Sequence, residues 1–152
     1  MDDVMEILLV EDDPQDLELT LRVLQSDSLK SRIEVARDGE EALDFLFCRG
    51  PYSSRSPSRP PKLVLLDLKL PKLDGLQVLQ EIKARPEFRA LPVVVLTSSG
   101  EQRDLVESYR LGANSYIQKP VDISQFRQTV KTLGLYWLLV NRPPPDKAFA
   151  NE

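Results

Sequence analysis

The amino-acid sequence predicts an α/β domain built as a doubly wound, five-stranded parallel sheet with five helices. Its apolar residues gather in short continuous runs that end in Pro, Gly or charged residues, as expected for strands covered on both faces of a parallel sheet. These runs alternate with segments in which apolar residues recur at helical spacing, which is typical of βαβ units. A chain of 152 residues is long enough for one such domain, and the strand order 2-1-3-4-5 is a common arrangement at this size.

The strands and helices can be assigned in order along the chain. The strands are expected at residues 7–10, 33–36, 62–67, 92–96 and 115–118. The helices are expected at about residues 14–26, 38–49, 74–85, 101–111 and 122–141. Several helix starts carry capping residues, namely Asp13 before Pro14, Asp74 before Gly75, Ser99 with Gln102, and Asp122 with Gln125.

Residues 1–141 are expected to form a single domain, followed by a polar C-terminal tail at residues 142–152. Residues 49–61 are expected to be an extended loop before the third strand, because they lack apolar periodicity and acidic residues. A loop of this length is either functional or mobile. Its arginines and tyrosine can contact a partner, but we expect a solvated, mobile loop. Cys48, beside this loop, shows no evident basic or metal partner and is interpreted as a small packed side chain.

The composition excludes several classes of function. A formal net charge of -4 argues against nucleic acid as the main partner. The N-terminus does not resemble a signal peptide, and no apolar run approaches the roughly 20 residues that cross a bilayer, so we expect no membrane association. The single cysteine excludes an internal disulfide and fits a reducing compartment, so we expect a cytoplasmic protein. Because the chain has no histidine, any bound metal must be a hard ion held by oxygen atoms.

Polar and charged side chains stand where four of the predicted strands end. The carboxyl ends of parallel strands meet at one edge of the sheet, which is where such folds bind ligands. Each of these residues alone has an ordinary structural explanation as a helix cap, a strand residue or a solvated charge. Their common position favours a functional site composed of Glu11 and Asp12 after the first strand, Asp67 after the third, Thr97 after the fourth and Lys119 after the fifth.

The chemistry of this set points to phosphoryl transfer. Three crowded carboxylates repel one another, and a divalent cation such as Mg²⁺, which binds carboxylate, carbonyl, water and phosphate oxygens, relieves the repulsion. Asp67 can then act as a nucleophile that forms an acyl phosphate. Lys119 and the hydroxyl of Thr97 can each bind a phosphoryl oxygen.

The motifs around these residues resemble the response-regulator receiver domains of two-component signalling, which have a flavodoxin-like or CheY-like fold. The resemblance spans about residues 5–140 and is carried by residues 8–14 (Leu-Leu-Val-Glu-Asp-Asp-Pro), 66–75 (Leu-Asp-Leu-Lys-Leu-Pro-Lys-Leu-Asp-Gly), 95–98 (Val-Leu-Thr-Ser) and 116–120 (Tyr-Ile-Gln-Lys-Pro). It implies that a sensor histidine kinase phosphorylates Asp67. It also implies a signalling protein rather than an enzyme, although such a domain takes part in its own phosphorylation and dephosphorylation.

The resemblance also assigns roles to the surrounding residues. Mg²⁺ would be held by Glu11, Asp12, Asp67 and the backbone carbonyl of Lys69. Thr97 and Tyr116 would form the switch pair, and Lys119 would bind the phosphoryl group before a cis peptide bond to Pro120. Two residues depart from the common pattern. Glu11 stands where many members have Asp, which predicts metal contact through a water, and Lys69 replaces a more usual Asn or Met.

Two features indicate which receiver domains this chain resembles most. The 49–61 loop and the ending Tyr136-Trp137-Leu138-Leu139-Val140 are most similar to the regulators paired with bacterial phytochrome kinases, and no further domain is evident, so we expect a single-domain regulator. The last helix also has apolar residues outside the stripe that can pack on the sheet. We therefore expect a homodimer through this helix, with the fourth helix and fifth strand; the residues expected at the interface are Tyr136, Trp137, Leu138 and Leu139. The alternative is that these residues fold back onto their own domain.

Two other functions are compatible with the fold class. A Mg²⁺-dependent phosphohydrolase that resembles the haloacid dehalogenase family would use Asp67 as nucleophile, but it would carry a second Asp where this chain has Lys69. A flavin- or nucleotide-binding module would have a first loop rich in Gly, Ser or Thr. Here that loop is acidic and would repel a phosphate.

Overall fold

Five parallel strands form one central sheet in the order β2-β1-β3-β4-β5, as the sequence predicts. The computed structural model describes residues 5–25, 31–56, 59–98 and 102–133. The strands are β1 (Met5–Val10), β2 (Ser31–Ala36), β3 (Leu63–Asp67), β4 (Val93–Thr97) and β5 (Ser115–Gln118). The helices are α1 (Pro14–Gln25), α2 (Gly39–Leu46), α3 (Gly75–Ala84), α4 (Gln102–Arg110) and α5 (Ile123–Thr132), with short 3-10 turns η1 (Gly50–Tyr52) and η2 (Pro86–Phe88). None of the helices in this part of the chain is long and apolar enough to cross a membrane.

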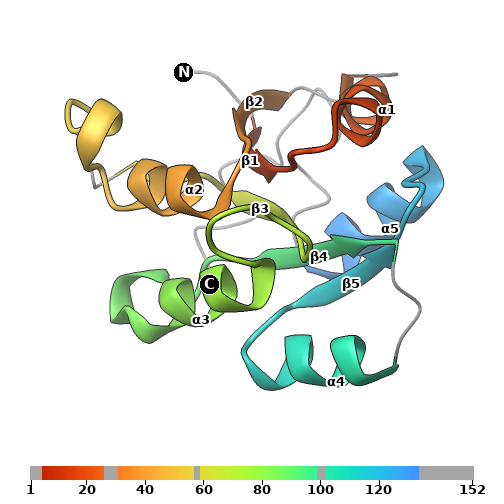
Figure 1. Ribbon diagram of the computed structural model, residues 1–152. Coiled ribbons are helices and arrows are strands. Elements are labelled where there is room, and N and C mark those ends of the chain that lie inside the picture. Colours follow the sequence, from red (N-terminus) through yellow and green to blue (C-terminus); the bar gives the residue numbers. More distant parts are fainter. Residues whose placement is uncertain (1–4, 26–30, 57–58, 99–101, 134–152) are drawn as a thin grey trace, which may run out of the picture.

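The helices cover both faces of the sheet, with α1 and α5 on one side and α2, α3 and α4 on the other (Figure 1). Alternate residues of each strand point to opposite faces, so Leu8 and Leu66 pack in the core beneath α2 and α3. Leu9 and Leu65 pack in the second core beneath α1 and α5. All residues of the central strands β3 and β4 are buried. The strands that carry the predicted site are therefore held from both sides.

The predicted helix starts agree with the structure wherever it describes them. Asp13 caps α1 by accepting a hydrogen bond from the Gln15 N–H, and Asp74 forms a reciprocal capping box with Gln77 at the start of α3. At the start of α5, the side chain of Asp122 accepts a hydrogen bond from the Gln125 N–H. The predicted cap at Ser99 lies outside the described residues.

Two predicted helix ends need comment. The helix expected to run to about residue 49 ends at Leu46, because Cys48 and Gly50 have positive φ angles of 55° and 58°, a left-handed conformation that terminates a helix. The last helix was expected to reach residue 141. The structure describes it from Ile123 to Thr132, and residues 134–141 lie outside the described residues.

Most described residues of the 49–61 segment are exposed, as expected for a solvated loop, and its mobility stays a prediction; Tyr52 and Arg55, however, pack against α2. Tyr52 packs edge-on against Phe45 with ring centroids 5.2 Å apart, and its hydroxyl donates a hydrogen bond to Glu41 Oε2 at 2.8 Å. The guanidinium of Arg55 stacks on the ring of Phe45 at 3.6 Å and donates to the Phe45 carbonyl. Arg55 also lies 3.6 Å from the sulfur of Cys48, so Cys48 has a basic neighbour that the sequence did not reveal.

The contact between Tyr52 and Glu41 predicts that Tyr52→Phe destabilises the domain. The change removes a hydrogen bond to a carboxylate, and we expect the free energy of unfolding in urea at neutral pH to fall by about 1–2 kcal/mol. Burial, the hydrogen bond to Glu41 and nearby negative charge raise the pKa of Tyr52 to about 12. The stabilisation should therefore be complete below about pH 10, the ordinary tyrosine value, and should be lost as the pH rises towards 12.

The matched control is Tyr109→Phe, because the Tyr109 side chain on α4 is exposed (48%). This variant should stay within about 0.5 kcal/mol of the wild type. Equal stability of the two variants would mean that Tyr52 does not anchor the segment.

Candidate functional site

The strand register brings the five predicted site residues to one edge of the sheet. Val10 of β1 pairs with Leu66 of β3, so the next residues, Glu11 and Asp67, follow at neighbouring strand ends. Thr97 ends β4, one position beyond the residue that pairs with Asp67. Lys119 follows β5, and its N–H donates a hydrogen bond to the Thr97 carbonyl at 2.8 Å. The predicted convergence of Glu11, Asp12, Asp67, Thr97 and Lys119 is thus what the fold produces.

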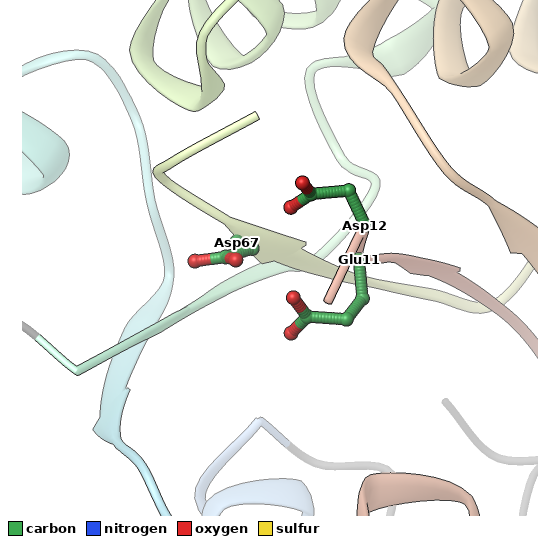
Figure 2. A group of neighbouring side chains, drawn as sticks. All are labelled: Glu11, Asp12 and Asp67. Atoms are coloured by element: carbon green, nitrogen blue, oxygen red, sulfur yellow. The ribbon is translucent and has the colours of Figure 1, made fainter. Parts of the chain in front are cut away.

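Three of these residues form an acidic cluster. One carboxylate oxygen from each of Glu11, Asp12 and Asp67 lies within 4.8 Å of the others. Figure 2 shows these side chains projecting from the adjoining ends of β1 and β3. Glu11 and Asp67 are buried, whereas Asp12 is exposed to solvent.

The ammonium group of Lys119 lies against this cluster. Its Nζ is 2.5 Å from Glu11 Oε1 and 3.1 Å from Asp67 Oδ2. The Lys119 side chain is only 9% exposed. A buried charge without an opposite charge is costly, so each group here stabilises the other.

The environment shifts the pKa values of both partners. Burial raises the pKa of Glu11 to about 7; the carboxylate of Asp67 adds to this effect, and Lys119 opposes it. For Lys119, burial alone would lower the pKa, but the contacts with Glu11, Asp67 and Asp16 outweigh it and hold the pKa above its ordinary value. The pKa of Lys119 is therefore held high and that of Glu11 is raised, mainly by burial.

The acidic cluster fits a hard divalent cation. Three carboxylates meet one ammonium in this cluster, and Glu11 Oε1 is completely buried with Lys119 Nζ as its partner at 2.5 Å. Together with the exposed Asp12, this leaves carboxylate oxygens of the kind that Mg²⁺ or Mn²⁺ bind. The N–H of Lys69 lies 3.4 Å from Asp67 Oδ1. The role of its carbonyl as a ligand stays a prediction.

A glycine fixes the loop that carries Asp67. Gly75 donates its N–H to the Leu68 carbonyl at 2.8 Å. A Cβ atom at Gly75 would lie 2.3 Å from the Asp67 carbonyl oxygen and 2.6 Å from Leu68 Cα, distances that are sterically forbidden. The absence of a side chain at Gly75 therefore lets the start of α3 press against the strand end that carries Asp67.

The predicted switch residues and the cis peptide bond lie along β4 and β5. The Lys119–Pro120 bond is cis, as expected. Thr97 is fully buried at the end of β4, and Tyr116 is half-buried in β5, where it pairs with Val95. Their role as a switch pair stays a prediction. The residues expected at a dimer interface, Tyr136 to Leu139, lie outside the described residues.

The sequence reasoning missed Asp16. Its Oδ2 lies 3.0 Å from Lys119 Nζ, so it is a fourth acid at the edge of the sheet. The available signal was its place in the first turn of a helix that begins beside Glu11 and Asp12. An acid at that position has a common local explanation, because negative charge is favourable at helix N-termini, so its place in the sequence gives no functional signal.

Comparison with known proteins agrees with this geometry. Residues 7–131 match the family of response regulator receiver domains. The chain belongs to this family.

Individual relatives cover nearly the whole receiver domain. The probable methanogenesis regulatory protein FilR2 of Methanothrix harundinacea is 43% identical over 94% of this chain and 90% of its own length. The bacteriophytochrome response regulator AtBRR has a structure with a TM-score of 0.81 and 52% identity, covering 91% of this chain and 99% of that one. The Mn²⁺-bound form of response regulator Rcp1, a protein of Synechocystis, gives a TM-score of 0.73 at 38% identity, covering 93% of this chain and 99% of the other. The receiver domain described here is therefore close to phytochrome response regulators.

The raised pKa of Glu11 predicts how the stability of the metal-free protein depends on pH. Between the ordinary value of about 4.3 and about 7, the folded chain holds a proton that the unfolded chain has released. The contribution of Glu11 to the free energy of unfolding should therefore be fully present below this window and should fall by about 1–3 kcal/mol as the pH rises through it. Glu11→Gln should remove this dependence and stabilise the metal-free protein above about pH 7 by a similar amount.

Urea unfolding in the presence of a chelator, repeated across this pH window, measures both effects. The control is Glu81→Gln, because Glu81 is an exposed carboxylate on α3 and its removal should leave the pH dependence as in the wild type. A wild-type dependence that survives in Glu11→Gln would contradict the assignment to Glu11.

Proposed function

We propose that this receiver domain accepts a phosphoryl group from a histidine kinase onto Asp67, in a reaction that depends on Mg²⁺. The supporting observation is the position of Asp67. Its carboxylate is buried at the edge of the sheet, within reach of two further acids and 3.1 Å from the ammonium of Lys119. A carboxylate in this setting can act as a nucleophile towards phosphorus while Lys119 binds a phosphoryl oxygen.

The transfer exchanges one bond for another. An oxygen of Asp67 attacks phosphorus, a new O–P bond forms, and the N–P bond to the donor imidazole breaks. The donor nitrogen leaves with the bonding electron pair. Because this chain contains no histidine, the donor must be another molecule. The protein is thus a phosphoacceptor in signalling rather than an enzyme with a separate substrate, and it takes part in its own phosphorylation and dephosphorylation.

Glu11, Asp12, Asp67 and the carbonyl of Lys69 would hold Mg²⁺, whose positive charge offsets that of the phosphoryl oxygens. The three carboxylate oxygens within 4.8 Å of one another and the Mn²⁺-bound structure of Rcp1 support this assignment. Lys69 stands where a phosphohydrolase would need an acid, and the acidic first loop would repel a flavin phosphate. We therefore favour neither alternative.

Phosphorylation would shift the domain between two packings that already exist. Thr97 would move towards the phosphoryl group, and Tyr116 would turn into the space that Thr97 leaves. This would remodel the surface formed by α4, β5 and α5. The burial of Thr97 and the partial burial of Tyr116 support the proposal, because a side chain in the core can turn only when a neighbour makes room.

The kinase that we propose is a bacterial phytochrome, because the similarity to AtBRR reaches 52% identity. A cytoplasmic location and the division into a domain at residues 1–141 and a tail at 142–152 remain predictions. The receiver fold itself, by contrast, does not depend on the identity of the kinase.

Incubation with Mg²⁺ and acetyl phosphate, read by intact mass, tests the phosphoacceptor. The wild type should gain the mass of one phosphoryl group, and Asp67→Asn should gain none, because the amide is not a nucleophile for this reaction. A chelator should prevent the gain in the wild type. Asp74→Asn is the matched control, since Asp74 caps α3 and does not line the site. Unchanged labelling of Asp67→Asn would reject the assignment.

We also propose a homodimer through α5, together with α4 and β5. The interface would include Tyr136, Trp137, Leu138 and Leu139. In the described part of the chain, the support comes from α4, where Val106 is 56% and Tyr109 is 48% exposed. Two large apolar side chains exposed on one helix are consistent with a surface that another chain covers.

Light scattering at high micromolar concentration tests the dimer. The wild type should have the mass of two chains, and Val106→Asp should shift it towards one, because an unpaired carboxylate would be buried at the interface. Leu19→Asp is the control, since Leu19 is equally exposed (52%) but lies on α1. A monomeric wild type, or equal effects of the two variants, would count against this interface.

A further inference from the structure

Asp16 is an acid that contacts the site from outside the acidic cluster. It lies in the first turn of α1, and its Oδ2 is 3.0 Å from Lys119 Nζ. Among the described residues, the acids with oxygens close enough together to hold a metal ion are Glu11, Asp12 and Asp67. Asp16 thus touches the lysine of the site without belonging to that group.

The hydrogen-bonding capacity of Lys119 explains why this contact is informative. An ammonium has three N–H donors, and Nζ has three carboxylates around it, from Glu11 at 2.5 Å, Asp16 at 3.0 Å and Asp67 at 3.1 Å. Two of these three carboxylates belong to the acidic cluster. Lys119 therefore competes with any cation for the oxygens of Glu11 and Asp67.

Asp16 offers Lys119 a carboxylate that is not among the proposed ligands of the cation. When Glu11 and Asp67 ligate a cation, the ammonium must give up part of its contact with them. Without another carboxylate it would keep a buried and poorly paired charge, which is unfavourable. With Asp16 in place, the ammonium remains paired, at a position from which it still reaches the edge of the sheet.

We propose that Asp16 is a positioning residue that holds Lys119 when Glu11 and Asp67 bind a divalent cation, so that Asp16 strengthens cation binding through Lys119. This inference rests on the metal site of the proposed function and deepens it. The ordinary explanation, that an acid in the first turn only stabilises the helix, predicts no link between Asp16 and Lys119 in cation binding.

Calorimetric titration of the whole chain with MgCl₂ tests the proposal. Asp16→Asn should weaken Mg²⁺ binding about three- to tenfold, a typical coupling between contacting charges. In a Lys119→Met background, the same change should have little further effect, because no ammonium remains to be held. Asp16→Glu, which keeps a carboxylate, should restore most of the affinity in the wild-type background. Glu18→Gln, on the exposed side of the same helix, measures the effect of simply removing a nearby negative charge.

Each outcome decides the question. Equal losses from Asp16→Asn with and without Lys119 would show direct attraction of the cation and would overturn the proposal. So would an affinity that Asp16→Asn leaves unchanged or raises. Urea unfolding without Mg²⁺ checks that each variant is folded. If Asp16→Asn does not fold, the Mg²⁺ affinity of Asp16→Glu serves as the test instead. Failure of the proposed function would look different, because the wild type itself would then bind no Mg²⁺ and gain no phosphoryl group.

Discussion

The charge balance around Lys119 is the constraint on which the rest of the site depends. Parallel strands that end at one edge bring Glu11 and Asp67 together with little access to water, and two buried carboxylates beside each other are unfavourable. The ammonium of Lys119 compensates them only in part, since Glu11 still has a pKa raised to about 7. An edge of this kind favours any additional positive charge. The attraction for a divalent cation is thus built into the strand ends, before any ligand arrives.

The fold can sustain this unfavourable arrangement because the strands beneath it cannot move apart. β3 and β4 are buried along their whole length, and each buried apolar side chain contributes about 1.5–3 kcal/mol. A few such side chains offset the cost of poorly compensated charge at the edge. The loop after β3 is tied to α3 by the hydrogen bond from the Gly75 N–H to the Leu68 carbonyl, which the absence of a Cβ atom at Gly75 makes possible. Stability therefore comes from the two apolar cores, and the unfavourable electrostatics are confined to the edge where phosphoryl transfer is proposed.

The sequence predicts best what depends on the position of a residue in a strand or at a helix start. The strand ends at Glu11, Asp67, Thr97 and Lys119 followed from short apolar runs, because a parallel sheet leaves little choice about where such ends meet. What it could not predict depends on pairs of residues from different elements. The packing of Arg55 on an aromatic ring of α2, and the reach of Asp16 towards β5, appear only when the elements are placed together. Composition predicted a solvated loop without revealing these contacts, and an acid in the first turn of a helix has a common local explanation that gives no functional signal.

In the proposed function, Lys119 would also link the metal-free state of the domain to the phosphorylated state. In the metal-free chain its ammonium stands where a cation would otherwise be needed, and in the phosphoryl-transfer chemistry proposed here it must bind an oxygen of the incoming group. One side chain can serve both purposes only if it can shift between partners without losing all of them. The three carboxylates around Nζ allow such a shift, since releasing one still leaves the others. The proposed switching would need this kind of shared contact, because an ion pair with a single partner would have to break completely before the site could rearrange.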